Sequence, residues 1–385
     1  MRLGMILAAL AFIILAAAPV RADNEILIGH FASMTGETAT FGTSTDEGIR
    51  LALDQINAAG GVLGRQIKVI TEDDQSKPEE AVTAVQKLIN QDHVVALLGE
   101  VASSRSLAAA PVAQRAHIPM LSPASTNPAV TQKGNYIFRC CFIDPFQGAA
   151  MANYAMDDLK FTKFAVLRDV KSDYSVGLRE FFSDVVTKRG GKIVSDLSYS
   201  AGDVDFKAQL TDIKRADPQA IYVPGYYNDI ALICRQAREL GLTCPLMGGD
   251  GWDSEKTFQI GGDAVNGCYF TNHYSPDEDR PAVKQFITAY KAKYHDKVPD
   301  AMAILGFDGM RIMADAITRA GDTTGGKIRD ALAATKDFPG ASGTITIDAD
   351  RNAQKAIVIL KIDGGKTHFV GSVDPAGHRQ PTTGS

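Results

Sequence analysis

Residues 25–61 read EILIGHFASMTGETATFGTSTDEGIRLALDQINAAGG. The apolar run Glu25–Phe31 predicts a strand, and Asp46–Ala59 predicts a helix because its apolar residues recur at helical spacing. Those residues are Ile49, Leu53 and Ile56, and the helix ends at Gly60 and Gly61. A strand followed by a helix is the repeating unit of parallel α/β sheets.

The same alternation continues through both halves of the chain. Further strands of the first half are predicted at Gln66–Ile70, Val94–Leu98, Ile118–Ser122 and Tyr136–Arg139. After the first of them, Ser76 and Glu79 predict a capping box, with Pro78 in the first turn of the next helix. The second half has predicted strands at Phe164–Leu167, Lys192–Leu197, Ala220–Val223 and near Leu246, and helices at Ser175–Lys188, Phe206–Ala216 and Asp229–Leu240. The sequence therefore predicts an α/β fold of two doubly wound lobes, each a parallel sheet covered by helices.

The first 22 residues have the pattern of a secretory signal peptide. Arg2 precedes the apolar stretch Met5–Val20, and Val20-Arg21-Ala22 has small residues at the two positions that a signal peptidase reads. A membrane anchor is the alternative, but the uncharged core Leu3–Val20 is at the short edge of the roughly 20 residues that span a bilayer. We expect cleavage before Asp23, release into the periplasm and no stable membrane insertion.

The charge of the exported chain disfavours two classes of partner. Removing residues 1–22 takes away two arginines and leaves 38 basic against 45 acidic residues, a net charge of about −7 with His neutral. Such an acidic balance does not favour nucleic acid or an anionic membrane as a partner.

The five cysteines cannot all pair within one chain. Export permits disulfides, and Cys234 and Cys244 are the best candidates because a helix would carry the first and the start of the next strand the second. Cys140 and Cys268 are expected to be buried small side chains. No C-x-x-C or H-x-x-x-H spacing occurs, so the sequence predicts neither a metal site nor a cofactor.

Motifs of catalysis are missing from the sequence. Gly321–Lys327 matches G-x-x-x-x-G-K, but Ile328 stands where Mg²⁺ requires a hydroxyl, and a helical pattern at Met310–Arg319 precedes it instead of a strand. Gly248–Gly251 lacks the dinucleotide-binding spacing, and neither G-x-S-x-G nor H-E-x-x-H occurs. We therefore do not expect an enzyme.

Three polar loops follow predicted strands, at the carboxyl ends where open α/β sheets bind ligands. In Gly99–Ser106, hydroxyls and free N–H groups at a helix start can hold a carboxylate, or only cap the helix. In Leu121–Pro128, two prolines brace a turn that presents carbonyls and a Thr hydroxyl. In Met247–Trp252, Asp250 stands between glycines, either as the counter-charge of an ammonium group or as an Asp-Gly turn.

In order and spacing, these loops and their neighbours resemble the periplasmic branched-chain amino-acid-binding proteins, close to the leucine/isoleucine/valine-binding protein of ABC importers. The likeness runs from about Ile26 to Asp363. Its strongest pieces are MTGETATFG (34–42), DD (73–74), SSRS (103–106), SPASTNP (122–128), RCCFIDPFQG (139–148), PGYYNDIALICRQARELGL (224–242) and GGDGWDS (248–254).

This resemblance implies the type I periplasmic-binding-protein fold, with two Rossmann-like lobes joined by a three-stranded hinge. A small amino acid would be bound in the cleft by hinge closure and delivered to a membrane permease. The implied parts are a signal peptide (1–22), an N-terminal lobe (23–143 with 275–349), a C-terminal lobe (144–274 with 350–372) and a flexible tail (373–385).

The resemblance also implies which residues contact the ligand. Ser103 and Thr126 would hold the carboxylate, and Thr126 and the Ala124 carbonyl would also contact the ammonium. From the other lobe, Asp250 would bind the ammonium. The aromatic residues implied are Tyr174 and Tyr226, which would close over the ligand, and Phe41, which would form a wall. Ala102, Ser125, Phe146 and Trp252 complete the predicted set, the last two by proximity alone.

Two positions depart from the family pattern. Founding members carry Glu where Asp250 stands, and the shorter side chain leaves the identity of the ligand open. They also have a disulfide joining the segments around Ser76 and Ala102, and neither residue is Cys here. The alternatives are a binding protein for aromatic acids, amides or urea-like solutes, and a sensor ectodomain of the same fold. We expect a monomer.

Overall fold

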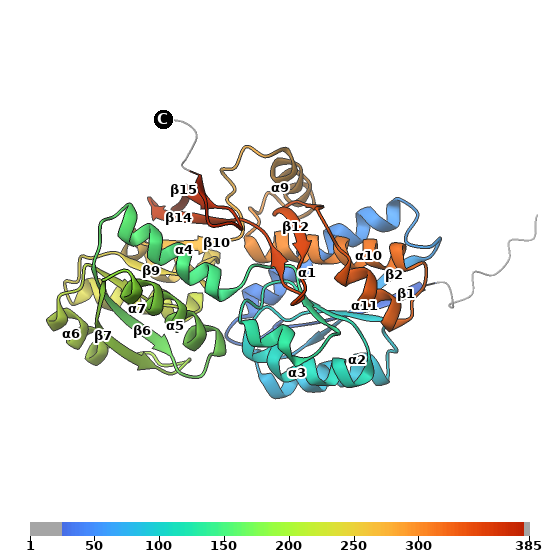
Figure 1. The fold of residues 1–385 in the computed structure, drawn as a ribbon, viewed down its shortest axis with the longest axis horizontal. Helices are drawn as coiled ribbons and strands as arrows, with labels where there is room; N and C mark the ends of the chain where they lie inside the picture. The colour runs from blue at the N-terminus through green and yellow to red at the C-terminus, as the bar shows by residue number, and fades with distance from the viewer. Residues whose placement is uncertain (1–24, 381–385) are drawn as a thin grey trace, which may run out of the picture.

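The computed structural model describes residues 25–380, so the predicted signal peptide lies outside the described residues. Figure 1 shows two lobes side by side, with the blue and cyan part of the chain in one and the green and yellow part in the other. Within residues 25–380, no helix is both long enough and apolar enough to cross a membrane.

The first lobe is built on a five-stranded parallel sheet in the order β2-β1-β3-β4-β5. Its strands are β1 (Glu25–Ala32), β2 (Gln66–Asp73), β3 (Ala96–Leu98), β4 (Met120–Ser122) and β5 (Ile137–Arg139). Side chains alternate along β1, so Ile26 and Ile28 pack into one apolar cluster and Phe31 into another. The sheet is thus buried on both faces. This agrees with its strand sequences, which are continuously apolar and do not alternate between apolar and polar residues.

Helices from two distant parts of the chain cover this sheet. They are α1 (Ala39–Ala58), α2 (Pro78–Asn90), α3 (Ser103–Ala116), α9 (Pro281–Lys293), α10 (Ala301–Ala320) and α11 (Gly325–Ala333). The closest approach is between α1 and α10, where Gly48 faces the Ala303 carbonyl and Gly306 faces the Thr45 carbonyl. A side chain at either glycine would overlap the backbone of the other helix, so both positions require glycine.

The second lobe is built on an eight-stranded mixed sheet in the order β16-β15-β14-β10-β9-β8-β6-β7. Its parallel strands are β6 (Lys163–Asp169), β7 (Lys192–Tyr199), β8 (Ala220–Tyr222), β9 (Leu246–Gly248) and β10 (Tyr269–Asn272). Antiparallel strands β14 (Ile357–Asp363), β15 (Lys366–Val373) and β16 (Arg379–Gln380) extend it. Its helices are α4 (Asp144–Asp157), α5 (Asp173–Lys188), α6 (Lys207–Ala216), α7 (Tyr227–Glu239) and α8 (Glu255–Gly261).

The chain passes between the two sheets three times. It leaves β5 for α4, returns after β10 to α9, and leaves again between β13 (Ala353–Gln354) and β14. Strand β13 belongs to a small antiparallel sheet with β11 (Phe338–Gly340) and β12 (Gly343–Ile347). The cleft between the lobes is therefore bordered by the three connections.

Several local predictions differ from the structure. The predicted capping box is wrong: the N-cap of α2 is Lys77, and the Ser76 hydroxyl donates to the Thr35 carbonyl, 2.9 Å away. Helix α1 begins at Ala39, seven residues before the predicted start, because Gly42 lets its first turn lie against the backbone of Ser33. A loose tail was expected from residue 373, yet Arg379 pairs with Val373 through β16.

The predicted pairing of Cys234 with Cys244 is also wrong. All five cysteines are free thiols, and the Cys234 thiol lies against Cys268 in the apolar core beneath the second sheet. Cys140 and Cys268 are fully buried, as expected.

Candidate ligand-binding site

A small cavity lies between the lobes, at the carboxyl ends of their strands, with about 200 Å³ of unfilled space. Its lining from the first lobe is Phe41, Val101, Ser103, Ala124, Thr126 and Met302, and from the second lobe Tyr174, Tyr226, Asp250 and Gly251. Seven of the eleven predicted site residues are among them, and four of the seven come from the three polar loops of the sequence.

Hydrogen bonds between the lobes close the cleft around this cavity. The Tyr227 hydroxyl donates to the Glu37 carbonyl over 2.9 Å. Asn127 Nδ2 donates to the Asp173 carbonyl over 2.8 Å, and Asp173 N–H donates to the Ser104 hydroxyl over 3.0 Å. Because these bonds lie on more than one side of the cavity, the structure is a closed conformation.

The first-lobe side of the cavity offers hydrogen-bond donors. Ser103 is the first residue of α3, so N–H groups of the first turn and the positive end of the helix dipole point toward the cavity. Its hydroxyl accepts from Asn127 N–H at 3.2 Å, which fixes the oxygen between α3 and the β4 loop. Thr126 Oγ1 is buried and has no hydrogen-bond partner among residues 25–380. This side is suited to an anionic group.

The second-lobe side presents one carboxylate. Asp250 follows β9, is 3 % exposed, and places Oδ2 3.0 Å from His273 Nε2. Burial lowers the pKa of His273 to about 4, against the opposing effect of Asp250, so the imidazole is neutral at pH 7. Nε2 therefore carries the ring proton and donates it to Oδ2. Oδ1 of Asp250 is buried without a partner in the described part of the chain, and this side is suited to a cationic group.

Aromatic rings form the remaining wall. Tyr174 and Tyr226 stack with centroids 5.2 Å apart at 10°, and Phe41 meets the Tyr226 ring edge-on at 5.8 Å. Gly251 lies under both tyrosines, and a Cβ there would come within 2.6 Å of the Gly225 carbonyl oxygen. The wall therefore depends on glycine at that position, and it favours an apolar group on the ligand.

A buried ionic network supports the first-lobe loops from below. Arg105 Nε lies 3.1 Å from Glu100 Oε2 and 3.8 Å from Asp74 Oδ1. The Ser33 hydroxyl lies 2.8 Å from Asp74 Oδ1 and 3.0 Å from Glu100 Oε1. Burial and the neighbouring Glu100 charge raise the pKa of Asp74 to about 7. Because Ser33, Asp74 and Glu100 follow the ends of β1, β2 and β3 and Arg105 lies in α3, the network holds the strand ends and the start of α3 together.

Four predicted residues do not line the cavity. The Ser125 hydroxyl turns inward and donates to the Glu100 carbonyl at 2.8 Å, and Ala102 N–H donates to the Glu100 carboxylate. Trp252 packs into the core with its Nε1 donating to the Val223 carbonyl at 2.9 Å. Phe146 packs in the other core cluster of the second lobe.

Sequence reasoning missed residues that arrive from distant segments. Met302 reaches the cavity from α10, and His273 reaches Asp250 from the end of β10. Neither lies in a loop with a recognisable motif, and the strand that His273 follows, β10, is not among those predicted from the sequence. In the described part of the chain, no three His, Cys, Asp or Glu side chains are grouped to hold a metal ion.

Comparisons with known proteins agree with this architecture. The model of the periplasmic binding protein family matches residues 25–367. A leucine-, isoleucine-, valine-, threonine- and alanine-binding protein of Pseudomonas aeruginosa is 32 % identical over 349 residues, covering 90 % of this chain and 92 % of the relative.

Two solved structures are similar over nearly their whole length. The leucine binding protein LivK of Thermotoga maritima has a TM-score of 0.88 and 42 % identity, covering 91 % of this chain and 99 % of the other. The branched-chain amino acid binding protein LivJ of Streptococcus pneumoniae, in complex with isoleucine, has a TM-score of 0.85 and 36 % identity, covering 89 % and 98 %. The type I periplasmic-binding-protein fold predicted from the motifs is thereby confirmed, and the chain belongs to the periplasmic binding protein family.

Proposed function

We propose that this protein is the extracytoplasmic solute-binding component of an ABC importer and that it binds a small apolar amino acid between its lobes. The observation that carries the proposal is the pair of opposed poles in one closed cavity. Hydrogen-bond donors of Ser103 and Thr126 face the buried, unpartnered Oδ1 of Asp250 across about 200 Å³. An α-amino acid is a zwitterion, so its carboxylate can face the donors of the first lobe while its ammonium faces Asp250.

The energetics favour such a ligand. A carboxylate and an ammonium are both costly to desolvate unless each gains charge-assisted hydrogen bonds. Bonds of that kind contribute about 1.5–3 kcal/mol each, so a few of them account for micromolar or tighter binding. Ala124 offers its carbonyl to the ammonium, while Phe41, Tyr174 and Tyr226 surround an apolar side chain. Relatives that are named for leucine, isoleucine and valine support this class of ligand.

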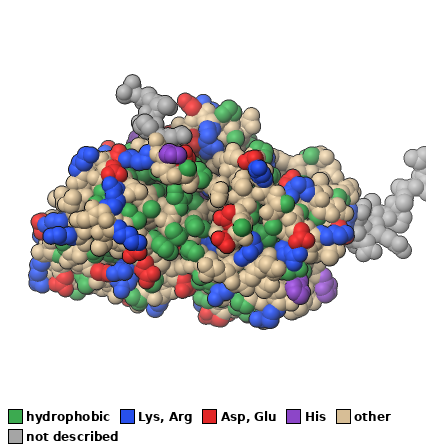
Figure 2. Space-filling model, in the orientation of Figure 1, with side chains coloured by type: hydrophobic (Ala, Val, Ile, Leu, Met, Phe, Trp, Pro, Cys, Tyr) green, Lys and Arg blue, Asp and Glu red, His purple; other side chains and the backbone are tan. Residues whose placement is uncertain are grey.

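Hinge closure is the proposed mechanism. The two bodies are residues 23–143 with 275–349 and residues 144–274 with 350–372, and the ligand gains contacts from both only in the closed form. A membrane permease would recognise that form after export of a monomer through the signal peptide 1–22. On the face drawn in Figure 2, acidic and basic side chains are interspersed over both lobes, which does not favour nucleic acid or an anionic membrane as a partner.

A ligand screen tests the proposal. The chain from Asp23 onward is screened by thermal shift against leucine, isoleucine and valine, and against benzoate, acetamide and urea. A ligand at 100 times its Kd stabilises the folded state by about 2.7 kcal/mol, so amino acids should raise the melting temperature clearly. If the aromatic acid or the amides raise it and the amino acids do not, the amino-acid function is refuted.

A further inference from the structure

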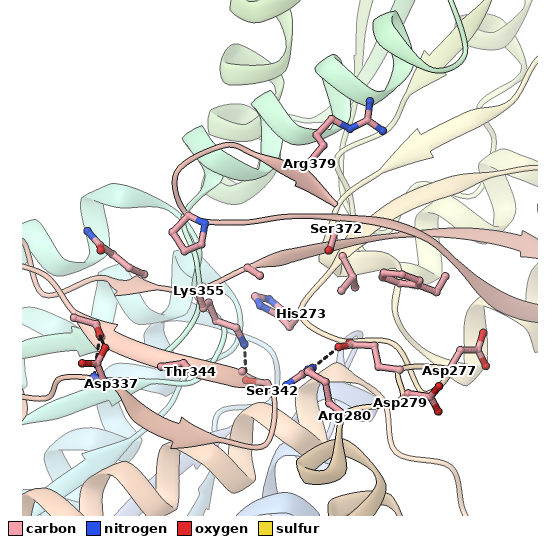
Figure 3. Close-up of a pocket in the computed structure, with 18 of the residues that line it drawn as sticks. His273, Asp277, Asp279, Arg280, Asp337, Ser342, Thr344, Lys355, Ser372 and Arg379 are labelled. Atoms are coloured by element: carbon pink, nitrogen blue, oxygen red, sulfur yellow. Dashed lines mark hydrogen bonds and ion pairs between the residues drawn. The ribbon is translucent and has the colours of Figure 1, made fainter. Parts of the chain in front are cut away.

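A second and larger cavity opens on the side of the molecule where the hinge segments lie. It is separate from the small cavity between the starts of α3 and η3 (Asp250–Trp252). It has about 2530 Å³ of unfilled space, part of it open to solvent, and lies between β12 of the first lobe and β15 of the second. Figure 3 shows Lys355 and His273 pointing into its floor, close to Ser342, with Arg280 beside Ser342 and Asp279 farther out. We call this cavity the hinge groove.

Lys355 is the unusual residue of the hinge groove. It lies in the crossing between β13 and β14, is 1 % exposed, and its ammonium donates to the Ser342 hydroxyl. Among residues 25–380, no carboxylate lies within 4.0 Å of that ammonium. The nearby Asp308 carboxylate already accepts from Ala341 N–H at 2.6 Å and Ser342 N–H at 2.8 Å. Within the described residues, the buried ammonium has one neutral hydroxyl as its hydrogen-bond partner, which is costly, and the same burial lowers the pKa of Lys355.

His273 adds a second unsatisfied group to the same floor. Its Nε2 is committed to Asp250, and its Nδ1 is buried with no partner in the described residues. Because the single ring proton is on Nε2, Nδ1 is a hydrogen-bond acceptor. Lys355 and His273 both line this groove, so the donor and the acceptor face the same cavity (Figure 3).

The other cations of the hinge groove are already paired with carboxylates. Glu278 pairs with Arg280, and Asp279 pairs with Lys284. Arg379 pairs with Asp158, outside the groove. Asp337 accepts from the Thr346 hydroxyl, and the exposed Asp277 lies toward the mouth. Lys355 is therefore the cation that an entering ligand can neutralise.

We propose that the hinge groove is a second binding site, for a small oxyanion that also carries a hydroxyl, such as hydrogen phosphate. One oxygen accepts from the Lys355 ammonium, the Ser342 and Thr344 hydroxyls turn toward the same ligand, and the ligand hydroxyl donates to His273 Nδ1. Each unsatisfied group on the floor then gains the partner that its chemistry requires.

The position of the site couples it to the cleft between the lobes. Its walls come from β12 on one lobe and from Ser372 and Arg379 on the other, so hinge motion changes its shape. His273 also joins the floor directly to Asp250. An anion that fits the closed shape must raise the affinity of the cleft for its own ligand, and the cleft ligand must raise the affinity for the anion by the same factor. This coupling rests on the proposed function, whereas the anion site does not.

Titration calorimetry with inorganic phosphate at pH 7 tests the site, on the chain from Asp23 onward at constant ionic strength with chloride as the control anion. We expect saturable phosphate binding that weakens about tenfold or more in Lys355→Met, the loss of one charge-assisted contact. Ser342→Ala, which keeps the charge, should weaken binding by a smaller factor. Lys366→Met, which removes an exposed lysine at the start of β15, should bind like the wild type.

Two results would overturn the anion site: no saturable phosphate binding by the wild type, or equal affinity in the wild type, Lys355→Met and Ser342→Ala. If Lys355→Met does not fold, Ser342→Ala carries the test alone. Phosphate binding by a protein that binds no amino acid would refute the proposed function and leave the hinge groove site standing. Coupling is measured by titrating leucine with and without saturating phosphate, and an unchanged leucine Kd refutes it.

Discussion

Asp250→Asn removes the negative charge from the second-lobe pole and keeps the volume of the side chain. In the wild type, Oδ2 accepts from His273 Nε2 at 3.0 Å and Oδ1 is free to face the ligand. The amide oxygen of Asn can keep the bond to His273, which directs the amide NH₂ toward the ammonium of the ligand. The variant therefore loses one charge-assisted hydrogen bond. In its place the amide NH₂ of Asn faces the ligand ammonium, and both groups are hydrogen-bond donors. The lost bond alone is about 1.5–3 kcal/mol, which corresponds to about a ten- to hundredfold higher Kd for leucine.

The assay is calorimetric titration with leucine and with 4-methylpentanoate, which is leucine without its amine. We expect the loss for leucine only, because 4-methylpentanoate makes no contact that depends on the Asp250 charge. Asp263→Asn, the same substitution at an exposed position of the second lobe, is the matched control and should change neither Kd. If Asp250→Asn weakens both ligands equally, the carboxylate has a structural role and the ammonium pole is refuted.

Three further predictions concern the wall, a buried carboxyl and the core. Gly251→Ala puts a Cβ within 2.6 Å of the Gly225 carbonyl oxygen, so leucine binding should weaken at least about tenfold by calorimetry, whereas Gly326→Ala, with its nearest neighbour 3.6 Å away, should not change it. Burial raises the pKa of Asp144 to about 8 in the folded state, against 3.8 in the unfolded chain. The stabilisation by the neutral carboxyl is complete below pH 3.8 and is lost as pH rises toward and through 8. Between these two values the free energy of unfolding falls by about 1.4 kcal/mol per pH unit. Melting curves of Asp144→Asn should therefore fall less steeply from pH 5 to pH 8 than those of the wild type, and parallel curves contradict the shift. Trp252→Phe leaves the buried Val223 carbonyl without its hydrogen-bond donor. The free energy of unfolding in denaturant should fall by about 1–3 kcal/mol while the leucine Kd stays the same. A large change in Kd would show that Trp252 contacts the ligand.

The sequence predicts the fold well because the signals of a parallel α/β sheet are local. Short, continuously apolar runs such as Ala96–Leu98 indicate strands that are buried on both faces, and each strand is followed by a helical pattern. The chemistry at the strand ends is also local: a serine at the start of α3 and an acid between glycines lie on the side where the strands end. Both poles of the cavity could therefore be predicted.

Side-chain direction within a loop cannot be predicted in the same way. Ser125 and Thr126 are adjacent hydroxyl residues of one turn, yet Ser125 donates inward to the Glu100 carbonyl and Thr126 lines the cavity. Which of them turns inward depends on carbonyls supplied by another strand, and no pattern within the loop records those. Met302 and His273 were missed for a related reason, since Met302 lies on a helix of the segment that returns to the first lobe and His273 follows a strand 23 residues after Asp250.

The unpartnered atoms at the two poles bear on how the protein opens. Without a ligand, the closed conformation buries Thr126 Oγ1 and Asp250 Oδ1 with no partner, at a cost of about 1–3 kcal/mol for each. Opening exposes both atoms to water, so the empty protein gains by opening unless the hydrogen bonds between the lobes compensate. Those bonds involve the Glu37 and Asp173 carbonyls, which water can also satisfy in the open form. A zwitterion satisfies both poles at once, whereas a ligand with one charge leaves the opposite pole buried and unpaired. Selectivity for amino acids over simple carboxylates therefore follows from the cost of the pole left without a partner.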